Sequence, residues 1–207
     1  MNPSTHNATG SQAFDTGLTE LVEQASKGNR LAFDRLIDRF QGDIYRMIYY
    51  RIRARMDAED LTQDVFIRAY RSISRLREPG RFRSWLFTIA VNRVNDHLRN
   101  KKVRSIFKSS DESGDFYPDA GQPQDHPEAL EQILKQDFWR QIAKIAKKLS
   151  KMEREVFMLR FLDGLNIYDI AQVLKKSEST VKTHLYRALT KFKKEKALSH
   201  FLQENLS

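Results

Sequence analysis

The chain of 207 residues contains no cysteine, which excludes a disulfide scaffold, thiolate catalysis and any metal site that needs cysteine ligands. Glycine and proline are also scarce, with 8 and 5 residues, and this favours a helical chain over a turn-rich β fold. The sequence has no apolar run of roughly 18 residues that could span a bilayer, and its start lacks the pattern of a secretory signal. We therefore expect an all-α protein in the cytoplasm, without direct membrane insertion.

What the chain does contain is positive charge, with 36 Lys and Arg against 27 Asp and Glu. The excess lies at the two ends, because residues 109–129 hold six acidic and no basic side chains. Three of the five prolines fall in the same segment, which has no apolar period, so we interpret residues 105–129 as an extended acidic linker. Two basic parts joined by an acidic linker favour a polyanionic partner, either nucleic acid or an anionic membrane surface.

The first basic part shows the apolar spacing of helices. Asn29 is the expected N-cap of a helix whose continuation ends near Ile52. Asp57 is expected to cap the next helix, and Ser84 a long helix that covers about residues 85–104. These segments predict a small helical domain.

The second basic part is also helical by its spacing. A helix is predicted over about residues 127–149, and the sequence from Ser150 to Glu153 then matches a capping box that opens the next helix. Asn166 is expected to cap a short helix that ends at Leu174, and after a three-residue break a last helix begins near Glu178. The proportions of these last two helices are those of a helix-turn-helix.

The last helix carries polar side chains near its start and cations further along, as a recognition helix needs for base edges and phosphates. The candidate DNA contacts on this face are Thr180, Lys182, Thr183, His184, Tyr186 and Arg187. The alternative is a helical hairpin with a solvated charged face.

The helix of residues 85–104 has a second polar side. An aromatic ring, two amides and an arginine on one helix side suit single-stranded bases and their backbone. The residues on this side are Trp85, Thr88, Asn92, Asn95 and Arg99, and Lys101, Lys102 and Arg104 extend the positive track. The alternatives are a core position for Trp85 with ordinary surface amides, and an RNA-binding adaptor that uses the same side.

Four carboxylates, Asp57, Glu59, Asp60 and Asp64, lie close together in the sequence. They could hold Mg²⁺ and so serve a nuclease, but a helix start followed by a protein-binding surface explains them more simply. No glycine-rich phosphate loop or nucleophile–base arrangement is present. We therefore expect no catalytic residue, no metal and no cofactor.

Three stretches together resemble the bacterial extracytoplasmic-function (ECF) sigma factors, in the sigma-E-like group of the sigma-70 family. They are DAEDLTQDVFIRAYRSI (57–73), FRSWLFTIAVNRVNDHLR (82–99) and LDGLNIYDIAQVLKKSESTVKTHLYRALTKF (162–192). The resemblance implies an alternative sigma factor that directs core RNA polymerase to the promoters of a stress or envelope regulon, under control of an anti-sigma factor. A stand-alone helix-turn-helix regulator remains the alternative.

The resemblance also implies the division of the chain. Residues 1–17 would form a disordered tail, 18–104 the region 2 domain, 105–129 the linker and 130–207 the region 4 domain. In region 2, one surface would bind the β′ clamp helices of core polymerase, while region 4 would contact the β flap. The residues that this implies for the clamp contact are Asp60, Leu61, Gln63, Asp64 and Phe66.

The same resemblance assigns DNA contacts. Leu76 and Arg77, with the helix from Trp85, would open and read the minus-ten element, and the candidate face of the last helix would read the minus-thirty-five element. Relatives have an aromatic residue in the loop where this chain has Leu76, so the identity of the flipped base is left open.

Overall fold

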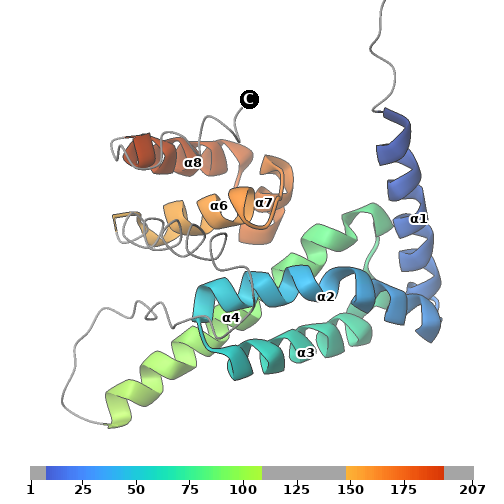
Figure 1. Cartoon of the computed structure of the whole chain (residues 1–207), viewed down its shortest axis with the longest axis horizontal. Helices are drawn as coiled ribbons and strands as arrows, with labels where there is room; N and C mark the ends of the chain where they lie inside the picture. Colours follow the sequence, from blue (N-terminus) through green and yellow to red (C-terminus); the bar gives the residue numbers. More distant parts are fainter. Residues whose placement is uncertain (1–7, 109–147, 194–207) are drawn as a thin grey trace, which may run out of the picture. The chain divides into compact units, whose positions relative to one another are not determined.

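The computed structural model describes residues 8–108 and 148–193, with side chains from 17–103 and 148–193 (Figure 1). These residues contain helices and turns and no strand, so the all-α prediction is confirmed. They belong to two separate compact units, one on each side of the undescribed segment. The predicted linker beyond residue 108 and most of the helix predicted over 127–149 lie outside the described residues.

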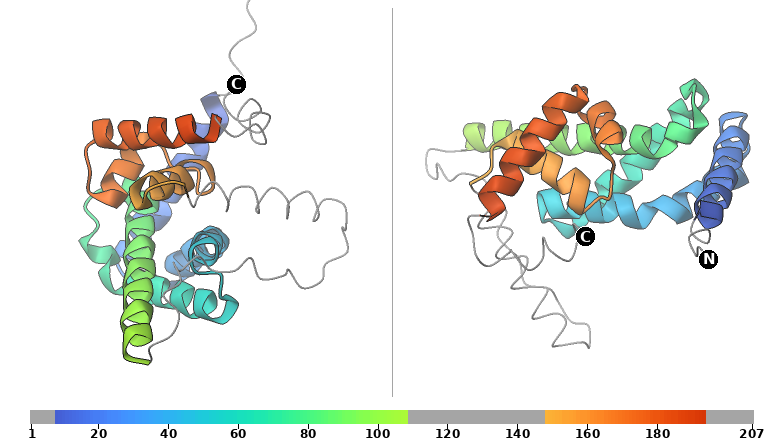
Figure 2. Two further views of the ribbon diagram at one scale, coloured as in Figure 1. Left: turned by 90° about the vertical axis from the view of Figure 1, so that its left-hand side faces the viewer. Right: turned by 90° about the horizontal axis from the view of Figure 1, so that it is seen from above.

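Unit 1 is a bundle of α2, α3 and α4, which all contact one another, with α1 packed against α2 and the α3–α4 connection. Its elements are α1 (Ala8–Ser26), α2 (Arg30–Ile52), α3 (Arg55–Ser72), the short 3₁₀ turns η1 (Ile73–Arg75) and η2 (Pro79–Arg81), and α4 (Phe82–Lys108). Figure 2 shows α1 standing across the start of α2. Among the described residues, no helix is long and apolar enough to cross a membrane.

The core of unit 1 lies among α2, α3 and α4. Leu36, Ile44 and Met47 of α2 are fully buried, as are Phe82 and Leu86 of α4. The burial of each such side chain is worth about 1.5–3 kcal/mol. This core fixes which sides of α3 and α4 are left for other contacts.

Helix α1 differs from the expected disordered tail of residues 1–17, since residues 8–17 form its first part. Leu18, Val22 and Ala25 are buried at helical spacing and anchor the helix. Once such a segment is ordered, each residue added at its end forms one hydrogen bond for the one residue that is fixed, whereas starting a helix fixes several residues for the first bond, so the helix can extend toward the N-terminus. Residues 1–7 lie outside the described part.

Asn29 caps α2 as predicted, because its Oδ1 accepts a hydrogen bond from the Ala32 backbone N–H at 3.2 Å. The prediction that Asp57 caps α3 is wrong. The helix begins at Arg55 after an extended Ala54, and Asp57 lies within its first turn. A carboxylate there still complements the positive end of the helix dipole.

The reason for the early start of α3 is the conformation of Arg53. Its backbone is left-handed, with φ of 52°, and its N–H donates to the Tyr49 carbonyl at 2.8 Å. A left-handed non-glycine residue costs about 1–2 kcal/mol. The Arg53 guanidinium lies over the rings of Tyr49 and Tyr50, at 5.9 and 5.2 Å from their centroids, and these contacts offset that cost.

Ser84 does not cap α4, contrary to prediction. The turn η2 leads directly into the helix at Phe82, because Pro79 already sets the backbone angle that a first turn needs. Ser84 is buried inside the helix, where its hydroxyl donates to the Arg81 carbonyl at 3.1 Å.

Unit 2 comprises α6 (Lys151–Phe161), α7 (Ile167–Leu174) and α8 (Glu178–Lys193), which pack on one another. The rings of Phe157 and Phe192 stack at 4.2 Å between centroids and tie α6 to the end of α8. Leu165 and Ile170 complete a small core.

The helix starts of unit 2 agree with prediction. Ser150 and Glu153 form a complete capping box, and the Asn166 side chain accepts from the Asp169 N–H at 2.8 Å. The turn before α8 contains Lys175 at φ of 53° and ends at Ser177, whose hydroxyl oxygen accepts from the Thr180 N–H at 3.2 Å. The helix-turn-helix proportions predicted from sequence are therefore present in α7 and α8.

Candidate nucleic-acid and partner interfaces

The outer side of α8 is exposed where the sequence predicts a recognition face. Lys182, Thr183 and Arg187 are exposed, and Tyr186 retains 73% of its accessible surface. The opposite side of α8 carries the buried stripe Val181, Ala188 and Phe192. Burial of that stripe turns the polar side of the helix outward.

The start of α8 is held by hydroxyl groups. Ser177 Oγ lies 2.9 Å from Ser179 Oγ and 2.8 Å from Thr180 Oγ1. The predicted contact Thr180 is therefore half-buried and already bonded, whereas Thr183 is exposed and donates its hydroxyl proton to the Ser179 carbonyl at 2.9 Å. Both hydroxyls keep acceptor capacity for a ligand.

His184 lies at the edge of the buried stripe and not at the centre of the exposed face. It is half-buried, and within the described residues its Nδ1 is buried without a hydrogen-bond partner. The reason is spacing, since residue 184 lies three positions after Val181 and four before Ala188, on the inward side of the helix.

The far end of α8 is fixed to α6 by an ion pair. Lys191 Nζ lies 2.6 Å from Glu153 Oε2 and 3.3 Å from the Lys148 carbonyl oxygen. Burial opposes ionisation of Glu153, but the hydrogen bonds from Lys191 and from the Ser150 N–H outweigh it and lower the pKa of this carboxyl. The charged Glu153 carboxylate therefore helps to hold α8 against α6.

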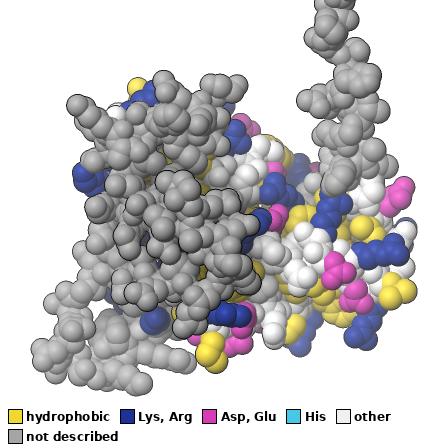
Figure 3. Space-filling model, viewed as in Figure 1, with side chains coloured by type: hydrophobic (Ala, Val, Ile, Leu, Met, Phe, Trp, Pro, Cys, Tyr) yellow, Lys and Arg dark blue, Asp and Glu magenta, His cyan; other side chains and the backbone are white. Residues whose placement is uncertain are grey.

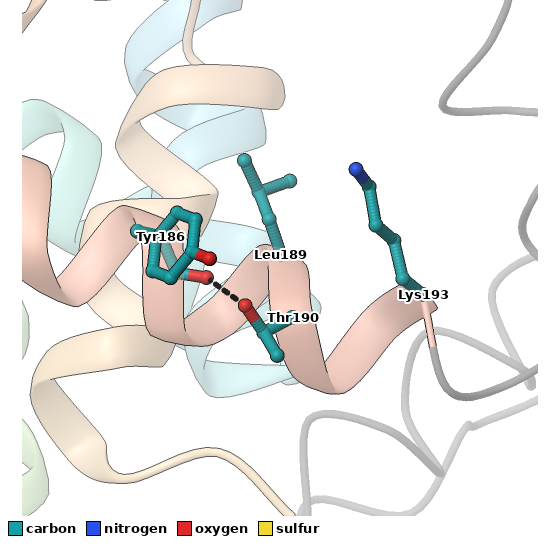
Figure 4. A pocket seen from close by; sticks show the side chains of 4 residues that line it. All are labelled: Tyr186, Leu189, Thr190 and Lys193. Carbon is teal, nitrogen blue, oxygen red and sulfur yellow. Dashed lines mark hydrogen bonds between the residues drawn. The ribbon is translucent and has the colours of Figure 1, made fainter.

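A hollow of about 320 Å³ lies beside the exposed side of α8, lined by Tyr186, Leu189, Thr190 and Lys193 (Figure 4). The Thr190 hydroxyl donates to the Tyr186 carbonyl at 2.8 Å. All four side chains come from α8, so the described residues supply only one wall.

Helix α4 presents its predicted polar side in graded exposure. Asn92, Asn95 and Arg99 are exposed, whereas Trp85 and Thr88 are half-buried. The half-buried residues lie near the start of α4, where the helix packs on the core, and the exposed ones lie further along it. At 1.5 Å per residue this side extends for about 21 Å, enough for several unstacked nucleotides.

Trp85 is partly buried and partly accessible. Its ring packs at 5.7 Å on the ring of Phe82, which is fully buried, yet part of its surface remains accessible. Such a ring is held in place on one side and can stack with a base on the other. Lys101 and Lys102 are exposed on the continuation of α4, while the side chain of Arg104 lies outside the described residues.

The loop before α4 holds the other predicted minus-ten residues. Leu76 is half-buried in extended backbone, and its N–H donates to the Ile73 carbonyl at 3.0 Å. Arg77 is exposed. Helix α1, which the sequence patterns did not predict, contacts both η1 and η2 and so supports the loop between α3 and α4.

On α3, only part of the residue set implied for a protein partner lies at the surface. Asp60 and Gln63 are exposed, but Leu61 and Phe66 retain only 7% and 6% of their accessible surface. These two side chains belong to the core with Val65, so a rigid partner cannot contact them fully. The spacing of apolar residues along α3 contained this signal.

Two apolar residues of α3 were missed by sequence reasoning. Met56 and Ile67 keep 78% and 48% of their surface exposed. They lie four positions before Asp60 and four after Gln63, so the four side chains form one exposed stripe. We call Met56, Asp60, Gln63 and Ile67 the α3 stripe.

Asp64 is half-buried and is bonded across unit 1. Its carboxylate accepts from Arg93 of α4 and, at 3.1 Å, from Arg68 of its own helix. Arg93 also lies 3.4 Å from Asp96, and Asp96 accepts from Arg99 at 2.9 Å. The five residues Arg68, Asp64, Arg93, Asp96 and Arg99 therefore form one chain of alternating charge between α3 and α4, which we call the ion chain.

Three of the four carboxylates considered for Mg²⁺ lie beside basic side chains, and Asp64 is one of them. Glu59 pairs with Arg55 at 3.0 Å, and Asp57 lies 3.5 Å from His97. Within the described ranges, no three His, Asp or Glu side chains are grouped as a metal site would need.

Further short-range ion pairs cover unit 1. Arg46 pairs with Asp43, and Arg81 lies 2.7 Å from Glu78. Where unit 1 is visible at the right of Figure 3, basic and acidic side chains lie beside one another. The positive excess is thus partly neutralised locally, and cations for DNA must be identified individually.

Comparisons with known proteins match both units to the same protein family. Residues 36–104 match the family model for Sigma-70 region 2, and residues 139–192 match that for Sigma-70, region 4. The ECF RNA polymerase sigma factor BldN of Streptomyces coelicolor is 35% identical over 185 residues, which cover 89% of this chain and 67% of BldN. The ECF RNA polymerase sigma-E factor of Escherichia coli K12 is 30% identical over 175 residues, or 81% and 88% of the two chains.

Solved structures show the same fold. CnrH, in complex with the cytosolic domain of CnrY, superposes with a TM-score of 0.61 at 25% identity, covering 91% of this chain and 99% of CnrH. The sigma factor RpoE of Bartonella quintana, in complex with the anti-sigma factor NepR, gives a TM-score of 0.56 at 22% identity, covering 78% and 94%.

Proposed function

This chain belongs to the sigma-70 family, in its ECF group, and we propose that its two units divide promoter recognition between the faces of α4 and α8. It is an alternative sigma factor, which binds core RNA polymerase and directs transcription initiation at promoters.

Unit 2 reads the minus-thirty-five element through α8. The exposed Lys182, Thr183, Tyr186 and Arg187 supply short polar groups for base edges and cations for phosphates. The support is that this polar side of α8 lies opposite the buried stripe of Val181, Ala188 and Phe192. This observation carries the proposal for unit 2.

Unit 1 opens and reads the minus-ten element. Trp85 offers a ring for stacking, Asn92 and Asn95 offer amide groups to exposed base edges, and Arg99 offers a cation to the backbone. Leu76 and Arg77 sit in the loop at the start of α4, where an extruded base would be received. The assignment of α4 is supported by the position of its aromatic ring, its two amides and its cation on one side of the helix.

The α3 stripe docks on the β′ clamp helices of core polymerase. Its centre holds Asp60 and Gln63, and exposed apolar side chains lie at both ends. A buried apolar contact with a few polar groups is the usual composition of a stable protein interface. Leu61 and Phe66, named in the sequence prediction, support this stripe from inside the core.

An anti-sigma factor is the regulatory partner. Bartonella RpoE was solved in complex with such a factor, NepR, and CnrH with the cytosolic domain of CnrY. For this chain we propose a partner of the same kind, which would silence it by covering polymerase- or DNA-binding surfaces. The genes controlled would form a stress or envelope regulon.

The test is run-off transcription with purified chain and core polymerase on a library of genomic fragments. We expect transcripts whose upstream sequences share two elements at fixed spacing. Core polymerase alone serves as the control, and transcripts that begin equally without the chain would refute the assignment. A stand-alone regulator predicts instead specific DNA binding without polymerase and no new transcripts.

A further inference from the structure

Helix α4 carries one carboxylate among its 27 residues, and this carboxylate lies at the edge of the candidate DNA side. Asp96 is one residue beyond Asn95 and four beyond Asn92. The same helix carries seven Lys and Arg residues. An acidic side chain beside a phosphate path opposes binding, so its position requires an explanation.

Asp96 pairs with Arg99, which is the cation that the proposed function assigns to the DNA backbone. Its Oδ1 accepts from Arg99 Nη2 at 2.9 Å, and its Oδ2 lies 3.4 Å from Arg93 Nη1. The Arg99 side chain is 73% exposed and that of Asp96 40%, so both are accessible to a phosphate. A DNA strand at this face must therefore compete with Asp96 for Arg99.

The other end of the ion chain keeps Arg93 in place without Asp96. Arg93 is only 23% exposed and donates to Asp64, which is 29 residues away on α3. Loss of the Asp96 charge therefore leaves the link between α3 and α4 intact. This separation makes the effect of Asp96 on DNA distinguishable from an effect on folding.

We propose that Asp96 limits the affinity of this sigma factor for the minus-ten strand, by holding Arg99 in an ion pair that phosphate must displace. The inference deepens the proposed function and rests on it. Phosphate binding by Arg99 exchanges one anionic partner for another, so the net gain is small. Without the Asp96 charge, phosphate binding by Arg99 breaks no existing ion pair, so the whole free energy of the new contact adds to DNA binding.

The experiment compares wild-type and Asp96→Asn chains, each assembled with core polymerase, for binding to a fluorescent promoter fragment over a series of salt concentrations. We expect Asp96→Asn to bind about two- to fivefold more tightly, as the loss of one exposed competing pair allows. Its salt slope should steepen by about 0.7, the value for one added contact to a single strand. Holoenzyme assembly is measured first, so that both samples contain equal active complex.

The matched control is Asp43→Asn. Asp43 pairs with Arg46 at the same three-residue spacing and has similar exposure, 35% against 40%, but it lies on α2. The Asp43→Asn variant loses one negative charge, as Asp96→Asn does. Unchanged DNA affinity in Asp43→Asn therefore excludes an effect of net charge alone. The double variant Asp96→Asn with Arg99→Ala should lose the gain, because Arg99 carries it.

Asp96→Gln removes the same charge with a longer neutral side chain, and either variant that retains the wild-type unfolding temperature serves for the measurement. Equal or weaker binding by the folded variant, while wild-type holoenzyme binds its promoter, overturns the inference alone. A gain that persists without Arg99 overturns it too. Failure of the wild-type holoenzyme to bind any promoter would instead refute the proposed function.

Discussion

Lys191 Nζ lies 2.6 Å from Glu153 Oε2, and this pair joins the end of α8 to the first turn of α6. The Ser150 N–H donates to the same carboxylate oxygen at 2.8 Å, so one atom serves both a helix cap and a bond between helices. Glu153 is buried, whereas Lys191 remains partly exposed. This carboxylate thus helps to hold α8 against α6, together with the stacked rings of Phe157 and Phe192.

Unit 2 should lose stability in acid because of Glu153. The pKa of this carboxyl is lowered in the folded state, since burial is outweighed by the bonds from Lys191 and Ser150. A lowered folded pKa gives stability that is present above the unfolded value of about 4.3 and is lost as pH falls through the folded value. Hydrogen exchange of the α6 and α8 amides, followed from neutral pH downward, measures this loss.

Glu153→Gln removes that pH dependence and lowers the free energy of unfolding by about 1–2 kcal/mol, as expected for a charged hydrogen bond with a half-exposed partner. Glu178→Gln is the control, because Glu178 is exposed and 3.9 Å from Lys182. Its effect should stay below about 0.5 kcal/mol. An unchanged acid transition in Glu153→Gln would contradict the assignment.

Lys182→Ala and Arg187→Ala should each weaken binding of holoenzyme to the upstream promoter element. If each cation contacts one phosphate, the salt slope falls by about 0.9 per variant. Fluorescence anisotropy with a duplex containing that element gives both values. Lys151→Ala, an exposed cation of the same unit at the start of α6, should leave affinity and slope unchanged.

Asp60→Arg should weaken association with core polymerase by about tenfold or more, because reversed charge at a docked surface costs over 1 kcal/mol. Asp64→Arg also opposes association, but it breaks the Arg93 pair as well and mixes docking with bundle stability. Neither change should alter the DNA affinity of unit 2. Glu59→Arg, on the neighbouring side of α3, is the control, and an equal loss there would remove the α3 stripe from the interface.

The free chain should bind promoter DNA far more weakly than holoenzyme does. Extruding a base costs a few kcal/mol, which a small domain cannot recover from its own few contacts. Core polymerase contributes by gripping the rest of the duplex. A mobility-shift titration of both forms on one promoter checks this expectation, and equal affinities would contradict it.

Local signals in the sequence were reliable where the structure is determined locally. Asn29, Ser150 and Asn166 cap helices as predicted, because an N-cap needs only its own side chain and the next turn. The same rule failed at Asp57 and Ser84. There the helix start is set by a left-handed Arg53 and by Pro79, whose backbone effects outweigh a side-chain cap.

The candidate site shows a similar division. The exposed sides of α4 and α8 follow from apolar spacing, so their polar residues could be identified from sequence. Leu61 and Phe66 were assigned to the surface by family resemblance, although their burial depends on how α3 packs. The bond between Asp64 and Arg93 spans 29 residues and leaves no local pattern.

The contact of α1 with η1 and η2 links the first described helix to the loop that we propose receives an extruded minus-ten base. Leu18 and Val22 bury their side chains in unit 1, and Ile73 of η1 is buried as well. Loss of the packing of α1 would therefore loosen this loop, although the two segments lie far apart in the sequence.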